Sequence, residues 1–118
     1  MKRDMDLVRS ILLAVEESGP PRGVVNLSIT GYSPELVSHH VWLMKEAGLV
    51  TAVDFSTHAN MVVKPKALTW AGHEFLDAAR NDGVWNSVKE RVGQHLLTVP
   101  FEVLKGMLVQ AAASMFGS

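Results

Sequence analysis

Apolar side chains recur every three to four residues in five stretches of the chain, and this spacing predicts five amphipathic helices. The predicted helices cover residues 4–17 and 33–47, and three more begin at the capping residues Thr69 and Asp82 and near Pro100. Ser33 is a natural N-cap, while Gly19 and the two prolines at 20–21 end the first helix. Gly72 lies inside the third helix, where glycine is unfavourable, and close packing against another stretch of backbone is one explanation for its presence there.

Alternating apolar and polar residues predict strands in the middle of the chain. The segment "VVNLSIT" (residues 24–30) is typical of a short, half-buried strand. The runs "LVTAVDFS" (49–56) and "MVVKPKAL" (61–68) flank "THAN", a polar connection of hairpin length. Pro65 cannot donate a backbone hydrogen bond, so the second run either forms an edge strand or ends there. Helices with a small antiparallel sheet give the fold class α+β.

The last predicted helix, "FEVLKGMLVQAAASMF" (residues 101–116), is apolar nearly all round. Such a helix must be buried on several sides. A domain this small cannot surround it alone, so we expect a second copy of the chain to cover it in a symmetric dimer. The expected contact residues are Phe101, Leu104, Met107, Leu108, Ala111 and Met115. The alternative is a partly frayed tail.

The order of the elements, helix, strand, helix and hairpin, is that of a winged helix. The stretch "GYSPELVSHHVWLMKEAGLV" (residues 31–50) resembles the turn and recognition helix of many bacterial repressors. The β-branched segment 24–30 stands where those proteins have a further helix, so the helix pair is shortened or missing. We therefore predict a winged-helix-like domain over residues 1–80 and a C-terminal helical extension over residues 81–118 on the same core.

Three blocks in order along the chain resemble a known family. They are "MKRDMDLVRSILLAVEE", "GYSPELVSHHVWLMKEAGLV" and "LTWAGHEFLDAARNDGVWNSVK". Together they are similar to the blocks of domain of unknown function family 2513, small proteins of bacteria and phages. The resemblance covers roughly residues 1–105 and implies a winged-helix-like fold, a bacterial or prophage source and no catalytic residues to carry over.

Trp42 is placed unusually by the helical spacing. At about 100° per residue, it lies at the centre of the polar face formed by Glu35, Ser38, His39, Lys45 and Glu46. Exposure of so large an apolar group usually marks a contact surface. The alternatives are a helix rotated from this phase, or C-terminal helices that cover Trp42. We expect Trp70 and Trp85 to pack in the core, with Leu96 also turned inward.

Length, composition and charge narrow the classes of function. With 118 residues, 47% hydrophobic and 19% charged, the chain is most simply one globular domain. It has no cysteine, no stretch typical of a signal peptide and no run long enough to span a bilayer, so we expect a soluble cytoplasmic protein without membrane contact. A net charge of −1 argues against tight, non-specific binding of nucleic acid.

Candidate catalytic and metal-binding patterns are weak. The five histidines include no pair spaced three or four residues apart on a helix, so we expect no metal site. We expect His40 to lie against the core with a hydrogen-bonded ring nitrogen. No nucleophile elbow or glycine-rich phosphate loop is present, so we expect neither an enzyme nor a cofactor.

Two kinds of partner compete for the second helix and the hairpin. Our first expectation is a DNA-binding or transcription-regulatory protein, because these elements carry polar side chains that bond bases and phosphates. Our alternative is a protein-binding adaptor or inhibitor, for example one encoded by a phage and acting on a host protein, with Trp42 as the anchor. The residues expected to contact either partner are Tyr32, Ser33, Ser38, His39, Trp42, Lys45, His58, Asn60, Lys64 and Lys66.

Overall fold

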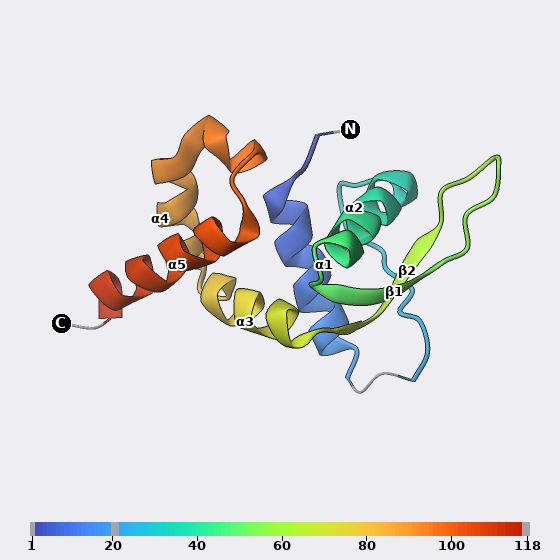
Figure 1. Ribbon diagram of the computed structural model, residues 1–118, viewed down its shortest axis with the longest axis horizontal. Coiled ribbons are helices and arrows are strands. Elements are labelled where there is room, and N and C mark those ends of the chain that lie inside the picture. The colour runs from blue at the N-terminus through green and yellow to red at the C-terminus, as the bar shows by residue number, and fades with distance from the viewer. Residues whose placement is uncertain (1, 20–21, 117–118) are drawn as a thin grey trace.

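Helices dominate an α+β fold that includes one two-stranded antiparallel sheet (Figure 1). The computed structural model describes residues 2–19 and 22–116. Its elements are α1 (Met5–Glu17), α2 (Pro34–Glu46), β1 (Val50–Asp54), β2 (Val63–Leu68), α3 (Trp70–Ala79), α4 (Asp82–Val92), the 3-10 helix η1 (Gly93–Leu97) and α5 (Phe101–Phe116). Within the described ranges, no helix has the length and apolar character needed to cross a membrane.

Capping side chains set where the helices begin. The carboxylate of Asp4 accepts a hydrogen bond from the backbone of Leu7, and Ser33 and Thr69 cap α2 and α3 in the same way. At α4 the prediction was wrong by one residue, because the side chain of Asn81 is the cap. Gly19, with φ +85°, follows the last turn of α1 as expected; the prolines at 20–21 lie outside the described residues.

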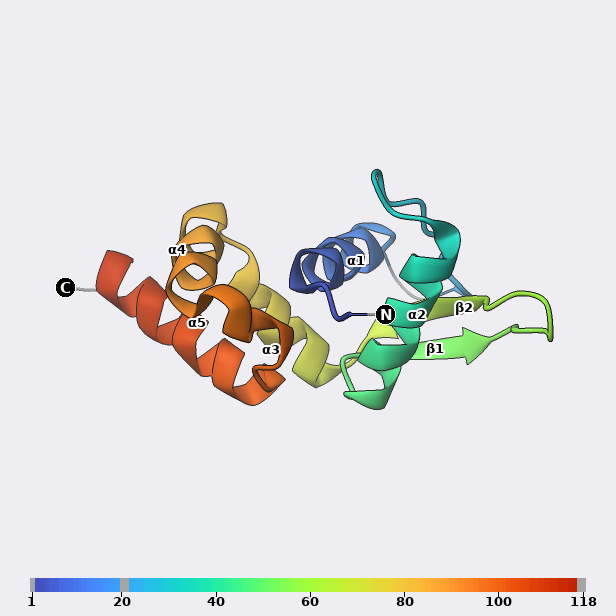
Figure 2. The ribbon, with the colours of Figure 1, turned by 90° about the horizontal axis from the view of Figure 1, so that it is seen from above.

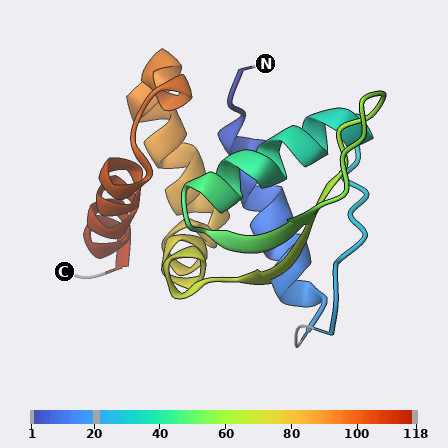
Figure 3. The same ribbon diagram turned by 45° about the vertical axis from the view of Figure 1, so that its right-hand side comes forward.

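The elements form two groups joined by α1. Figure 1 shows α3, α4 and α5 at one end of the molecule, and α2 with the β1–β2 hairpin at the other. Figure 3 shows α2 lying across the base of the hairpin, with the chain before α2 running beside β2. One hydrophobic core runs through both groups, because buried residues from α1, α2, α3, α4 and α5 form a single cluster.

The predicted hairpin is present, but the predicted strand at 24–30 does not join the sheet. The segment is extended and makes one backbone hydrogen bond to β2, from Val25 N–H to the carbonyl oxygen of Pro65 (2.7 Å). Pro65 has no N–H to return, so a ladder cannot continue from this point. The β1–β2 register shifts between Thr51, which pairs with Ala67, and Ala52, which pairs with Pro65.

Gly72 explains how α3 joins the rest of the fold. A Cβ atom at this position would overlap the carbonyl oxygen of Leu49, at the turn between α2 and β1. The same oxygen accepts a hydrogen bond from Thr69 N–H (3.0 Å). The predicted close approach to another backbone is confirmed.

The C-terminal helix is covered on one side by its own chain. Leu104, Leu108 and Ala111 are buried against α3 and α4, so the prediction that these three need a second copy was wrong. Its reason is geometric: α3 and α4 together form a surface wide enough to take one face of α5. Phe101 and Met107 are half-buried, and Met115 is exposed.

The fourth helix is shorter than the apolar spacing predicts. It ends at Val92, because Gly93 takes a positive φ of 58° and the chain turns into η1. Leu96 therefore lies in η1 and is half-buried instead of continuing the inner face of α4. Trp85 is buried as predicted, and its indole N–H donates to the carboxylate of Asp6 (2.8 Å).

His40 is fully buried and uses both ring nitrogens. Its Nε2 accepts from the backbone N–H of Asp4 (2.8 Å), so Nδ1 carries the proton and donates to the carbonyl of Leu36 (3.0 Å). The predicted core position is confirmed. The bond to Asp4 joins the start of α1 to the middle of α2.

Candidate interaction surface on α2 and the β1–β2 hairpin

The hairpin holds α2 in a fixed rotation. Ser38 Oγ accepts a hydrogen bond from the backbone N–H of Val63 in β2 (3.1 Å). Trp42 and Lys45 follow Ser38 at four and seven residues, so the three side chains form one row along the side of α2 next to the hairpin. Ser38 is buried at one end of this row, while Trp42 and Lys45 are exposed.

Trp42 lies outside the core, as the helical spacing predicts. Its side chain is 38% exposed, and its indole stacks on the imidazole of His39, with ring centroids 6.3 Å apart and an interplanar angle of 22°. Glu35, Lys45 and Glu46 on the same face are exposed. An aromatic group is therefore held in one orientation at the centre of a polar surface.

The surroundings of His39 favour its neutral form. Burial lowers the pKa of His39 below its ordinary value of 6.5, because a charged imidazolium loses hydration when it is covered. A neutral imidazole carries no charge to a phosphate at neutral pH. Because the His39 ring stacks on the indole, it instead extends the flat apolar surface of Trp42.

Two residues predicted to contact a partner are used inside the fold. Ser38 is buried and bound to Val63, so its place on the exposed face was wrong; a helical wheel cannot show that the hairpin covers this side of α2. The hydroxyl of Tyr32 donates to the carboxylate of Asp4 (3.0 Å), and burial, followed by Asp4, raises the pKa of Tyr32. Ser33 is exposed, but its Oγ caps α2.

The hairpin carries the other predicted residues, and they do not share one environment. His58 and Asn60 are exposed at the tip, where Thr57 N–H donates to the carbonyl of Asn60 (2.9 Å). Lys66 is exposed. Lys64 is tied down, since its Nζ donates to Asn26 Oδ1 (2.8 Å) and lies 5.8 Å from the centre of the Phe55 ring.

Charge on the combined surface is balanced. The exposed face of α2 has the acids Glu35 and Glu46 and the base Lys45, and the hairpin has the acid Asp54 and the bases Lys64 and Lys66. Hydrogen bonds from Ser56, and to a lesser extent the charge of Lys45, lower the pKa of Asp54, so this carboxylate stays ionised. Three positive and three negative groups create no excess that would attract a phosphate backbone.

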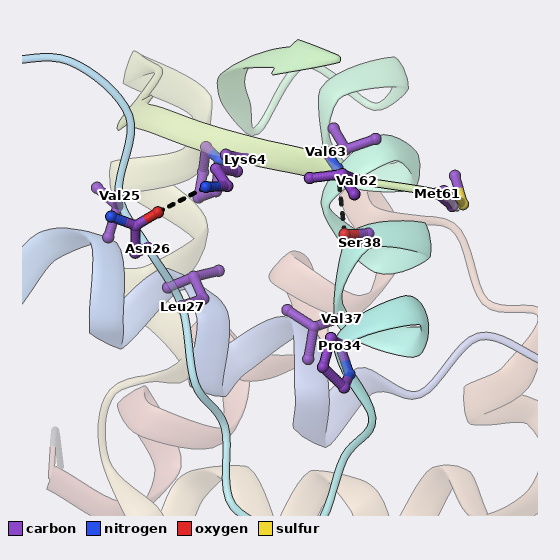
Figure 4. Close-up of a pocket in the computed structure, with 11 residues that line it drawn as sticks. Val25, Asn26, Leu27, Pro34, Val37, Ser38, Met61, Val62, Val63 and Lys64 are labelled. Atoms are coloured by element: carbon purple, nitrogen blue, oxygen red, sulfur yellow. Dashed lines mark hydrogen bonds between the residues drawn. The ribbon is translucent and has the colours of Figure 1, made fainter. Parts of the chain in front are cut away.

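A small pocket of about 200 Å³ lies between α2, β2 and the segment before α2 (Figure 4). The bond between Ser38 and Val63 forms one of its sides, and the bond between Lys64 and Asn26 forms another. The rest of the lining is mainly apolar, and Lys64 is its only ionisable residue. This pocket lies where segment 24–30 passes beside β2 without joining the sheet, and it offers no pair of groups for acid–base or nucleophilic chemistry. Across residues 2–19 and 22–116, no three metal-ligating side chains gather into a metal site.

Two exposed aromatic side chains were missed by the sequence reasoning. Trp70, expected in the core, is 82% exposed at the first position of α3, and Phe55 is 49% exposed just beyond β1. Trp70 follows the capping residue Thr69, and a first-turn residue can point away from the body of a helix bundle. Phe55 follows the last residue of β1, whereas the predicted strand 49–56 included it, and no local pattern in the sequence marks where the strand ends.

Comparison with known proteins adds a family and one bacterial relative. A model of the family described as "Hypothetical protein (DUF2513)" matches residues 2–97, the family that the three sequence blocks indicated. An "Uncharacterized protein" of Haemophilus influenzae is 42% identical over 106 residues, which cover 89% of this chain and 90% of that protein. No solved structure gives a significant match.

Proposed function

This chain belongs to the family described as hypothetical protein (DUF2513), and we propose that it is a non-enzymatic protein-binding module that contacts its partner through the exposed face of α2. Trp42 carries this proposal. A tryptophan stacked on a neutral histidine and surrounded by charged side chains has the composition of an interface anchor with a polar rim. Its orientation is fixed before binding, which lowers the entropy lost on association.

The form of the module is that of a shortened winged helix. A helix, an extended segment beside β2, a second helix and a hairpin follow one another in winged-helix order, without the helix that usually precedes the recognition helix. In this proposal α2 and the hairpin supply a rigid scaffold for contact with a protein, since a fold does not fix a function. A bacterial or phage-encoded adaptor or inhibitor acting on a host protein fits this form.

The balance of charge supports a protein partner over DNA. Three acids lie among the three bases of the surface, and phosphates would meet Glu35 and Glu46 on α2. Ser38, which would contact base edges in a DNA reader, is bound to Val63. A protein surface can match mixed charges around a central aromatic group.

The test compares two exposed tryptophans. We expect Trp42→Ala to abolish specific capture of a protein from a bacterial lysate, while Trp70→Ala, the same change on α3, leaves capture intact. Circular dichroism and thermal melting should show both variants folded. Equal capture by wild type and Trp42→Ala would reject the proposal.

DNA binding is the second candidate, and the hairpin favours it. Lys66, His58 and Asn60 are exposed on a hairpin that projects beyond α2, as in a wing that follows a groove (Figure 1). If DNA is the partner, duplex binding should weaken steeply with salt and be lost in Lys45→Glu, but not in Arg91→Glu on α4. Absence of binding to any duplex at low salt would exclude this function.

A further inference from the structure

The two outer edges of the β1–β2 hairpin differ in how far their backbone groups are hydrogen-bonded. On the free edge of β2, the N–H of Val63 is bound to Ser38 Oγ (3.1 Å). Pro65 has no N–H, and its carbonyl oxygen accepts from Val25 N–H (2.7 Å). Each of these features blocks pairing with another strand, as native proteins commonly do at sheet edges.

The edge of β1 has none of these covers among the described residues. Phe55 N–H donates to Val62 (2.7 Å) and the carbonyl of Leu49 accepts from Thr69 (3.0 Å), so the odd-numbered residues of β1 direct their backbone groups toward β2. Successive residues of a strand alternate in this direction, and the register shift skips a residue of β2, not of β1. Ala52 and Asp54 therefore direct their N–H and C=O groups outward.

The outward side of β1 is open to solvent. Figure 2 shows β1 as the outer strand of the hairpin, with no element running alongside its free edge. Asp54 is exposed and Ala52 is half-buried. No described residue is hydrogen-bonded to the outward backbone groups of these two residues.

β1 packs against α2, the helix that carries Trp42. Lys45, three residues after Trp42, is close enough to Asp54 for its charge to act on that carboxylate. A chain paired with β1 would pass the end of the row that Lys45 occupies. The side chains of its alternate residues would then point toward α2.

We propose that the free edge of β1 accepts an extended segment of the partner as a third strand, with an apolar side chain of that segment placed against Trp42. This inference rests on the proposed protein-binding function and specifies the conformation of the partner. The outward N–H and C=O groups of Ala52 and Asp54 can pair only with an extended backbone. The N–H and C=O groups of a helix are already hydrogen-bonded to each other. The segment must lack proline at the paired positions and carry apolar side chains at alternate positions.

Random linear peptides displayed on yeast are the probe for this proposal. Peptides that bind wild type should have alternating apolar residues, lose binding on Trp42→Ala, and retain it on Trp70→Ala. N-methylation of the peptide backbone should abolish binding at every second residue and leave it intact at the residues between. Peptides that need Trp42 but show a three- to four-residue pattern would overturn the strand pairing and leave the proposed function standing. Binders that do not need Trp42 would count against both, and a library that yields no binder would overturn the strand pairing.

A substitution in β1 tests the edge directly. Ala52→Pro removes one outward N–H without removing a bond to β2, and should weaken a selected peptide at least about tenfold, whereas Ala52→Val should bind as wild type. Amide exchange in wild type gives an independent answer if Ala52→Pro does not fold. The amides of Ala52 and Asp54 should exchange fast in the free protein and slow down with peptide bound; unchanged exchange at both would overturn the proposal.

Discussion

The helices α2 and α5 both leave apolar side chains exposed, but in opposite surroundings. On α2 the exposed group is Trp42, which stacks on His39 within a charged face. On α5 the exposed groups are Val103, Val109, Met115 and Phe116, spread over a helix with only two charged residues. Exposure alone does not distinguish these two surfaces.

The polar groups around each apolar side chain make the difference. In the proposed complex, the polar groups of α2 would fix where a partner places its own donors and acceptors, so contact with Trp42 would have one orientation. On α5 almost nothing fixes an orientation, and any apolar surface of suitable shape could cover it. Our proposal therefore places selective recognition on α2, and we expect self-association to use the outer side of α5.

Substitutions at neighbouring positions of α5 should separate its two sides most strongly. Leu108 is fully buried and Val109 is 53% exposed. Leu108→Ala should lower the free energy of unfolding by about 3 kcal/mol, because it leaves a cavity beside α3 and α4. Val109→Ala should change it by less than about 0.5 kcal/mol. Urea denaturation measures the free energy of unfolding of both variants. Similar losses of stability would contradict the assignment of Leu108 to the inner side of α5 and Val109 to the outer side.

The contact between α3 and the turn before β1 gives the next largest effect. Gly72→Ala should lower the free energy of unfolding by about 2 kcal/mol, because its new methyl group meets the carbonyl of Leu49. Gly106 lies on the open side of α5, so Gly106→Ala should stabilise the protein by about 0.5 kcal/mol. Thermal melting of both variants tests the pair; an unchanged melting temperature for Gly72→Ala would contradict the close packing.

Self-association through α5 is a smaller effect, and a point substitution tests it better than removal of the helix. Truncation before α5 would remove Leu104, Leu108 and Ala111 from the core and unfold the chain. Val109→Asp leaves the core intact and should weaken a dimer at least about tenfold. Light scattering over a range of concentrations measures this. A wild-type monomer at the highest concentration, or a dimer unaffected by the substitution, would contradict the prediction.

The smallest expected effect is the titration of His39. Folding lowers its pKa from the ordinary value of 6.5, so the neutral ring favours the folded state above that pH and this contribution is lost as the pH falls through the lowered value. Nuclear magnetic resonance should show His39 titrating below 6.5. In Trp42→Ala the ring is less covered, so its pKa should rise toward 6.5. A pKa at or above 6.5 in wild type would show that the stacked pair does not form in solution.

The sequence predicted local structure better than contacts between elements. Helix starts at Ser33 and Thr69, the hairpin, and the buried His40 follow from neighbours along the chain, and all are confirmed. The exposure of Trp42 was also predictable, because the spacing of polar and apolar residues along α2 shows which side of the helix faces solvent.

Errors arose where a distant element decides the outcome. Ser38 is buried because β2 returns beside α2, and Leu104 is buried because α3 and α4 form a surface for α5. Trp70 is exposed because, as the first residue of α3, its side chain points away from the core that α3 helps to form. That segment 24–30 does not join the sheet could have been predicted from the sequence. Pro65 has no backbone N–H, so it cannot return the hydrogen bond that a neighbouring strand would need.

The hydrogen bond from Asp4 to His40 means that the first turn of α1 is completed by a side chain of α2. A fragment that ends before His40 would lack this acceptor, and its α1 would fray from the N-terminal end. Detachment of α2 would expose the same amide, so protection of the Asp4 N–H, which lies at the start of α1, should report on the packing of α2 against α1. Exchange of one backbone proton thus reports whether α2 is packed against α1.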